Sequence, residues 1–228
     1  MSKTIPRPCA NRILSNLPPK QFALLKPHLS SVILPVRKQL EGRCKRIESV
    51  FFLEHGLASV VASDLDGRSI EVGIIGREGM TGLAVVLGVE RSPYETFMQA
   101  AGNGQRISAD KLRRALDRSV GLHRSLLLVA HAFHIQTTRT NLANARSKVK
   151  ERLARWLLMA DDRIGDDDLQ LTHEFLSTML GVRRAGVTAA VRALEAAALI
   201  TTKRGLITVI DRRGLIEISH GSYVPEVD

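Results

Sequence analysis

The stretch THEFLSTMLGVRRAGVTAAVRAL, residues 172–194, decides the interpretation of this chain. It predicts a helix, a tight turn at Gly181 and a second helix that begins at Arg183 or Arg184. A glycine at the turn permits the positive φ that such a short connection needs. Apolar residues that would hold the two helices at a fixed angle lie on both sides of the turn: Leu176, Leu180, Val182 and Val187. The stretch therefore predicts a helix-turn-helix.

Basic residues follow this turn. Two arginines open the predicted second helix, and Glu195 is the single acid against five basic residues between positions 182 and 205. The β-branched runs 199–202 and 206–210 flank a Lys-Arg-Gly turn, which predicts a hairpin. A basic hairpin beside a recognition helix is typical of a wing that lies on the phosphate backbone of DNA. The alternative is an ordinary αα-hairpin in a helical core, and the basic residues favour DNA binding over it.

The formal net charge of the 228-residue chain is +10, which favours a polyanionic partner. The excess is uneven, because residues 106–163 hold 13 basic and 5 acidic side chains whereas residues 172–228 hold 7 and 6. A solvated helix face explains the central excess equally well. A nonspecific nucleoid binder would need charge spread over a large surface, and the near balance after residue 172 argues against that class.

Cysteine usage and hydropathy exclude several other classes. Cys9 and Cys44 are too few for a disulfide framework and too few for a protein-only iron–sulfur cluster. No apolar run approaches the roughly 20 residues of a membrane span, and the N-terminal sequence lacks the apolar core of a signal peptide. We therefore expect a cytoplasmic protein with no membrane partner and no iron–sulfur cluster.

Residues 30–108 differ in character from the helical segments around them. Residues 9–29 look helical but are interrupted by prolines, whereas glycine-punctuated β-type runs then occur at 31–34, 49–53, 58–62 and 69–75. Asp64-Leu65-Asp66-Gly67 predicts a hairpin turn, and Gly102-Asn103-Gly104 predicts another turn between strands. Short strands at such spacing are typical of a small barrel or sandwich.

The helical part that follows includes a short helix ending near Arg118 and a long one over residues 122–145. Apolar residues seven positions apart form a stripe on the long helix and beyond it: Leu128, Ile135, Leu142 and Val149. The alternative is that this stripe packs on the β-domain of the same chain. Because so long a helix between two compact domains has too little partner surface within one chain, we expect part of the stripe to face a second subunit.

The order of β-domain, long helix and winged helix-turn-helix resembles the Crp/Fnr family of bacterial transcription regulators over roughly residues 10–218. The stretches GVRRAGVTAAVRALEAAALI (181–200) and IIGREGMTG (74–82) carry the resemblance. It implies an α+β fold with a cyclic-nucleotide-binding-like β jelly roll at 1–118, a dimerisation helix at 119–146 and a winged helix-turn-helix at 147–228.

The candidate effector pocket departs from the family pattern. The cyclic-AMP binders have a Gly-Glu pair followed by an Arg-Ser pair that grips the cyclic phosphate. Here the first region reads Gly-Arg-Glu-Gly at 76–79, shifted by one residue, and the Arg-Ser pair stands at a longer spacing and precedes Pro93. Cyclic nucleotide binding is therefore not favoured, and no cofactor is expected. The pocket residues that the resemblance implies are Gly76, Glu78, Gly79, Arg91 and Ser92.

The recognition helix departs as well. The family's base readers are an Arg, a Glu next to it and an Arg one turn later. Arg184 matches the first reader, but Ala185 and Ala189 stand at the other two, so the family's best-known half-site should not be read. An Arg can pair with guanine O6 and N7, while Ala and the Thr methyl suit the thymine methyl. The expected DNA contacts are Thr172, Arg183, Arg184, Thr188, Arg192, Lys203 and Arg204.

These observations predict a homodimeric, sequence-specific transcription regulator that binds a palindromic DNA operator. RNA polymerase is a further partner that such a regulator can contact. The alternative is a cyclic-nucleotide-responsive sensor whose ligand gates DNA binding. An enzyme is not expected, because the Ser, His and acidic residues are scattered and no phosphate-binding Gly-rich loop precedes a helix.

Overall fold

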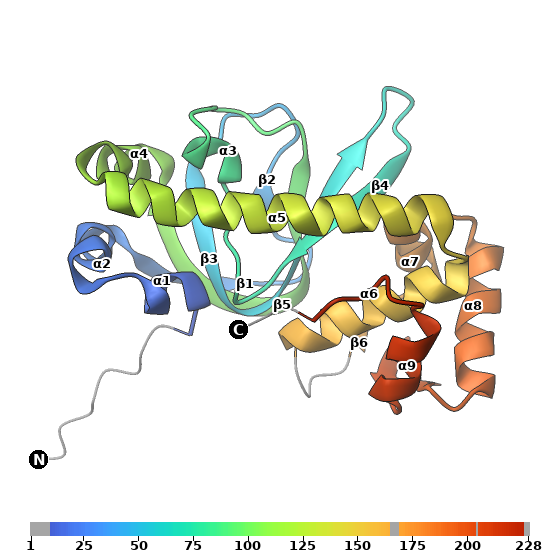
Figure 1. Ribbon diagram of the computed structural model, residues 1–228. Coiled ribbons are helices and arrows are strands. Elements are labelled where there is room, and N and C mark those ends of the chain that lie inside the picture. The colour runs from blue at the N-terminus through green and yellow to red at the C-terminus, as the bar shows by residue number, and fades with distance from the viewer. Residues whose placement is uncertain (1–9, 165–168, 204, 226–228) are drawn as a thin grey trace, which may run out of the picture. The chain divides into compact units, whose positions relative to one another are not determined.

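The computed structural model describes residues 10–164, 169–203 and 205–225 (Figure 1). Cys9 and Arg204 lie outside the described residues. The chain divides into two compact units, of which the first comprises residues 1–58 and 75–132 and the second residues 59–74 and 133–228. Among the described residues, no helix has the length and apolar character needed to cross a membrane.

One antiparallel sheet contains the strands of the first unit and also residues 59–74 of the second, in part. Its strands are ordered β1-β5-β3-β4, with β2 also paired to β5. The β-type runs of the sequence are confirmed as strands, and the runs 49–53 and 58–62 prove to be parts of one long strand. The bounds are β1 (Ser30–Leu34), β2 (Gln39–Glu41), β3 (Ser49–Ser63), β4 (Ser69–Ile75) and β5 (Glu95–Ser108).

The predicted turn at Gly102-Asn103-Gly104 is wrong, because these residues lie inside β5 and pair with β1. Two close backbone approaches explain the glycines. A Cβ on Gly102 would lie 2.0 Å from the carbonyl oxygen of His55, and one on Gly104 would lie 2.3 Å from that of Phe52. Glycine in a strand interior commonly marks such a close approach. These glycines predict a turn from the local sequence, but they are needed because the neighbouring strand leaves no room for a Cβ.

Helices close over the core of the first unit (Figure 1). The described part of the segment predicted to be helical at 9–29 forms α1 (Arg12–Asn16), α2 (Pro19–Leu25) and the 3-10 helix η1 (Lys26–His28), interrupted near the prolines as expected. Two further helices follow, α3 (Leu83–Val86) and α4 (Ala109–Arg118), and Ser108 caps α4 through its side chain. Their apolar side chains pack into one cluster that includes Leu25, Phe52, Met80, Leu112 and Leu122.

The long helix predicted at 122–145 is α5 (Val120–Arg146). Leu126 is fully buried, so one side of the helix packs on its own chain. Leu128 and Leu142 are 64% and 59% exposed, and Ile135 is 38% exposed. Val149 was expected in the same stripe but begins the next helix, because α5 ends before it. The stripe on α5 therefore consists of Leu128, Ile135 and Leu142.

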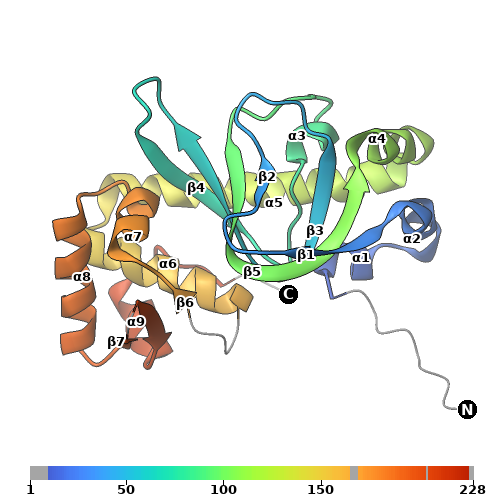
Figure 2. The same cartoon turned by 180° about the vertical axis from the view of Figure 1, so that it is seen from behind.

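The second unit is built around α6 (Val149–Ile164), which packs against three later helices (Figures 1 and 2). These are α7 (His173–Leu180), α8 (Arg184–Ala196) and α9 (Arg212–Ile218). A small antiparallel sheet of order β6-β8-β7 accompanies them, with β6 (Leu169–Gln170), β7 (Ile200–Lys203) and β8 (Leu206–Val209). The strands β7 and β8 form the hairpin that the sequence predicted after the second helix.

An ionic cluster fixes α9 to α6. The Arg212 guanidinium bridges the carboxylates of Asp161 and Asp162, and it donates a hydrogen bond to the hydroxyl of Tyr223. Tyr223 donates in turn to Asp162 at 2.8 Å. Charged groups shared among several partners hold one another in place, which makes a network more effective than an isolated surface pair.

The compact units do not coincide with the domain boundaries expected from the sequence. Residues 59–74, which include the tip of the β3–β4 hairpin, group with residues 133–228 rather than with the remainder of the β-sheet. The unit boundary also falls inside α5, between residues 132 and 133. The division at 1–118, 119–146 and 147–228 stays a prediction.

Adding one methyl group at Gly102 should strongly destabilise the first unit. We expect Gly102→Ala to lower the free energy of unfolding by roughly 3 kcal/mol, because the new Cβ overlaps the His55 carbonyl oxygen and the strand must move. Gly88→Ala is the matched control, since Gly88 has a φ of +81° but nothing within 4 Å of a Cβ, and should cost about 1 kcal/mol. Urea unfolding followed by circular dichroism measures both, and equal costs would contradict the close approach.

Candidate nucleic-acid interface

The turn between α7 and α8 has the geometry that the sequence predicted. Thr172 caps α7, with its side-chain oxygen accepting from the backbone N–H of Phe175 at 3.1 Å. Gly181 ends α7 with a φ of +60°, and its N–H bonds back to the carbonyls of the last turn. Arg183 then precedes the first residue of α8. A capped first helix, a left-handed glycine at its end and a second helix that begins three residues after that glycine are the local features of a helix-turn-helix.

A second constraint acts on Gly181. A Cβ there would lie 2.8 Å from Cδ1 of Ile70, which belongs to β4 and to the same compact unit. The angle between α7 and α8 is held by fully buried apolar side chains, including Leu176, Val187 and Leu194. The expected role of the apolar residues around the turn is confirmed by this packing.

The exposed face of α8 has small side chains in its middle and basic side chains at its ends. Arg184, Ala185, Ala189 and Arg192 are exposed, and Thr188 is half-buried. Within the described part of the chain, the guanidinium of Arg184 has neither a hydrogen-bond nor an ion-pair partner. Arg183, one residue earlier, is likewise exposed.

Thr188 is tied to α7 by a residue that sequence reasoning missed. Its hydroxyl donates to the carbonyl of Arg184 at 3.1 Å and lies 3.0 Å from Nδ1 of His173. His173 is the first residue of α7, and the two side chains are 15 positions apart. A single histidine at a helix start carries no local signal for such a bond.

One of the two DNA contacts expected on the wing, Lys203, lies at an exposed position. Lys203 ends β7 opposite Leu206 of β8 and is exposed, and Gly205 adopts a φ of +81°. Arg204 lies outside the described residues. Glu195, the single acid of this region, accepts a hydrogen bond from the hydroxyl of Thr202. That bond directs the carboxylate toward β7.

Comparison with known proteins places this geometry in a family of domains. Residues 151–218 match the Crp-like helix-turn-helix domain. A solved structure described as a Crp/Fnr-family transcriptional regulator from Eubacterium rectale is 16% identical, covers 93% of this chain and 99% of its own, and superposes with a TM-score of 0.72. A Crp/Fnr-family regulator from Thermus thermophilus is 20% identical, with coverages of 85% and 100% and a TM-score of 0.68.

This chain has the fold of the Crp/Fnr transcription regulators. FixK2 from Bradyrhizobium japonicum is also similar, at 15% identity, coverages of 87% and 99% and a TM-score of 0.68. No curated protein matches the chain in sequence. The predicted α+β fold with a C-terminal helix-turn-helix is confirmed, and a DNA-binding regulator is the function that the domain indicates.

The expected effector residues have their own partners within the first unit. Gly76 to Gly79 form a tight turn, in which Glu78 Oε1 accepts from the N–H of Gly76 at 3.1 Å. Arg91 is exposed and donates to the carbonyl of Cys44 at 2.9 Å. Ser92, by contrast, is buried. The two side chains of the Arg-Ser pair therefore have different partners.

The partner of Ser92 is Glu41, a buried acid of β2 that sequence reasoning missed. The Glu41 carboxylate accepts from the backbone N–H of Gly82, and the hydroxyls of Ser92 and Thr81 also hydrogen-bond to it. Burial raises the pKa of Glu41, and these three hydrogen bonds act in the opposite direction. Three neutral donors thus converge on a carboxylate of the chain itself.

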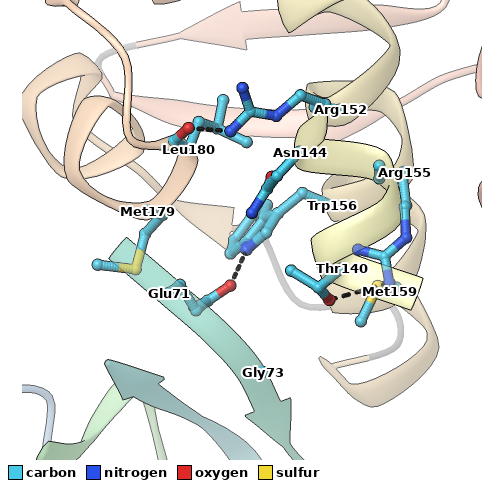
Figure 3. Close-up of a pocket in the computed structure, with 11 residues that line it drawn as sticks. Glu71, Gly73, Thr140, Asn144, Arg152, Arg155, Trp156, Met159, Met179 and Leu180 are labelled. Atoms are coloured by element: carbon cyan, nitrogen blue, oxygen red, sulfur yellow. Dashed lines mark hydrogen bonds between the residues drawn. The ribbon is translucent and has the colours of Figure 1, made fainter. Parts of the chain in front are cut away.

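A polar cluster lies next to the end of α7 (Figure 3). Arg152 of α6 donates to the carbonyl of Leu180, the last residue of α7, where helix carbonyls lack partners and a cation is favourable. Nearby, the indole N–H of Trp156 donates to Glu71 of β4 at 2.6 Å. Arg155 donates to the hydroxyl of Thr140 at 3.1 Å.

Glu71 is the unusual member of this cluster. It is 5% exposed, and one carboxylate oxygen, Oε2, has no hydrogen-bond partner among the residues that the structure describes. Burial raises the pKa of Glu71 to about 7, against the hydrogen bonds from Ser59 and Trp156 and the charges of Arg155 and Arg163. The sequence offers no signal for this, because an acid within a strand pattern reads as a solvent-facing position.

The buried carboxyl should make stability depend on pH. Because the pKa of Glu71 is higher in the folded chain than its ordinary value of 4.5, the folded state binds a proton that the unfolded state has released between about pH 4.5 and 7. The free energy of unfolding should therefore fall as pH rises through that window. Glu71→Gln should remove this contribution and stabilise the protein at pH 8 by about 1–3 kcal/mol.

Denaturant unfolding at pH 5, 6, 7 and 8 measures the effect. Asp66→Asn is the matched control, because it removes one negative charge from the same hairpin at a carboxylate that is 77% exposed. It should leave the slope of stability against pH unchanged. An unaltered slope in Glu71→Gln would contradict the role assigned to burial.

Proposed function

We propose that this chain is a sequence-specific transcription regulator that binds a palindromic DNA operator as a homodimer. The exposed face of α8 carries the proposal. Arg184 and Arg192 frame the small side chains Ala185 and Ala189, and the Arg184 guanidinium is not engaged by the described part of the chain. A helix whose exposed face has small apolar side chains in its middle and arginines at its ends suits the major groove. There an Arg can pair with guanine, and methyl groups can contact the thymine methyl.

The contacts separate into two kinds. Arg184 lies at the first residue of α8, where the N-terminal residues of a recognition helix reach base edges. Lys203 lies at the end of a wing strand, where a lysine acts on phosphate as a point charge. The proposed set of described contacts is completed by Thr172, Arg183, Thr188 and Arg192, and Arg204 belongs to it by sequence alone.

Removing a base reader and removing a phosphate contact should have different signatures. The operator is first obtained by selecting bound duplexes from a random pool. Arg184→Ala should then cost about 1–3 kcal/mol on the operator and relax the preference at one position of each half-site. Lys203→Ala should weaken binding to operator and scrambled DNA alike, and should flatten the logarithmic salt dependence by about one unit.

Titrations of both variants on both DNAs at several salt concentrations separate these roles. Arg213→Ala is a control, because Arg213 lies on α9 with a side chain that is 91% exposed and outside the proposed contacts. Equal losses of Arg184→Ala on operator and scrambled DNA would reject it as a base reader. Transcription with RNA polymerase on the selected operator tests whether the regulator activates or represses.

The homodimer is proposed from the apolar stripe on α5. Leu128, Ile135 and Leu142 recur every seven residues and are exposed along one helix. Such a stripe is matched by the same stripe on a second copy in a two-fold arrangement. Two recognition helices related in this way reach successive major grooves about 34 Å apart.

Charge in the stripe should dissociate the dimer. Sedimentation at micromolar concentration should give a dimer for the wild type and a weaker one for Leu128→Asp and Leu142→Asp, because each places a carboxylate in the helix pair. Ile33→Asp makes a similar change at a β1 side chain that is 86% exposed and should leave the dimer intact. A monomeric wild type would exclude the proposed interface.

The β-sheet unit is proposed not to bind cyclic AMP. A phosphate in a closed pocket needs a charge-assisted arginine contact and aligned donors. Arg91 donates to the Cys44 carbonyl, and Glu41 already uses the Ser92 hydroxyl and the Gly82 N–H. The alternative of a cyclic-nucleotide-gated sensor is therefore the less supported one.

Isothermal calorimetry with cyclic AMP tests this part of the proposal. The wild type should show no tight binding, and Arg91→Ala should give the same trace as the wild type. Tight binding that disappears in Arg91→Ala would show that the pocket is functional.

A further inference from the structure

The hydrogen bond between α7 and α8 bears on how bases are read. Thr188 lies one turn after Arg184 and one turn before Arg192, so it shares the outward face of α8 with them. Its side chain is half-buried, whereas Ala185 and Ala189 beside it are exposed. Thr188 is therefore the residue at which the DNA-facing side of α8 meets α7.

The hydroxyl of Thr188 both donates and accepts within the protein. Its single proton points to the Arg184 carbonyl at 3.1 Å, and its oxygen lies 3.0 Å from Nδ1 of His173. With the hydroxyl proton on Arg184, the imidazole must carry its proton on Nδ1 and donate to Thr188. The hydroxyl proton is therefore not free to donate to a base edge, and His173 holds the oxygen in place.

Fixing the hydroxyl also fixes the methyl group. A threonine in a helix divides between two side-chain rotamers, and an external donor to its oxygen selects one of them. The Cβ has one other heavy-atom branch, so the methyl is confined to a single position, which we infer faces the exposed side of α8 with Ala185 and Ala189. Three methyl groups then form an apolar patch between two arginines.

We propose that this patch reads the 5-methyl group of thymine and that His173 is the residue that positions the Thr188 methyl for it. The inference rests on the proposed function. The major groove presents the thymine methyl as its one apolar group, and a methyl patch is the protein surface that it fits. His173 acts through Thr188 and need not touch DNA.

Uracil is the probe, because it differs from thymine only by the missing methyl. On the operator selected from a random pool, single thymine positions are replaced by uracil and the ratio of the two dissociation constants is measured. The wild type should bind about fourfold more weakly at one thymine of each half-site, which is the effect of burying one methyl group. Other thymines should give ratios near one.

Two substitutions at Thr188 separate its branches. Thr188→Ser keeps the hydroxyl and removes the methyl, and should bring the uracil-to-thymine ratio at that position to about one. Thr188→Val keeps a methyl on each branch and removes the hydroxyl, and should retain the ratio. A ratio that persists in Thr188→Ser, or that is absent from the wild type at every position, would overturn the inference.

A matched pair tests His173. His173→Leu removes the donor and should lower the ratio toward one, because Thr188 then occupies both rotamers. His173→Asn should restore it, because the amide nitrogen of Asn can take the place of Nδ1. Thermal melts of all variants confirm that the unit is folded, and a purely structural histidine would change the melt without changing the ratio.

Two other results have distinct meanings. If His173 instead binds a phosphate, His173→Leu weakens thymine and uracil duplexes alike and flattens the salt dependence, which overturns the positioning role. If the random pool yields no preferred sequence, the proposed function fails, and this inference fails with it. An operator without a methyl-sensitive thymine leaves the function standing and rejects the inference alone.

Discussion

The backbone conformation at Gly181 is the constraint on which the DNA-binding unit depends. Its φ of +60° turns the chain from α7 into α8 within a few residues. An L-residue there would pay about 1 kcal/mol for the left-handed conformation, and its Cβ would also press against Ile70. Arg152 donates to the carbonyl of Leu180, the residue immediately before Gly181. A side chain of α6 therefore also holds the backbone at this turn. The direction of α8 follows from this local geometry.

The exposed face of α8 has few long polar side chains. Alanines occupy positions where longer polar side chains could reach base edges, and Ala is also the residue that most favours a helix. In the proposed interface few long side chains remain to discriminate bases, so shape and methyl contacts are proposed to carry more of the specificity. The bond from His173 to Thr188 then matters, because a small group reads a base only if its position is fixed.

Two buried acids of the strands differ in how their carboxylates are hydrogen-bonded. Glu41 is satisfied by neutral donors from nearby backbone and hydroxyl groups. Glu71 accepts from Trp156 on one oxygen, whereas its other oxygen has no hydrogen-bond partner in the described part of the chain. Burial favours the protonated form in both, which is why their pKa values are raised. Both acids consume donors that would otherwise be open to a ligand or to solvent.

The sequence by itself determined the features whose signals are local. A glycine at a left-handed position, a capping Thr172 and apolar residues at helical spacing predict α7, its turn and α8 without reference to distant residues. The wing hairpin and α4 follow from equally local turn and cap signals. The stripe on α5 was read correctly up to Leu142, but periodicity alone cannot show that a helix ends before Val149.

Only the tertiary structure decided the features that depend on contacts between distant segments. The glycines at 102 and 104 read as a turn until the close approach of β3 is known, and then they are required inside a strand. His173 and Thr188 are 15 residues apart, and Glu71 and Trp156 are 85 apart, so no local pattern links them. Hydrogen bonds and steric contacts act over a few ångströms in space, and a sequence records order along the chain rather than that distance.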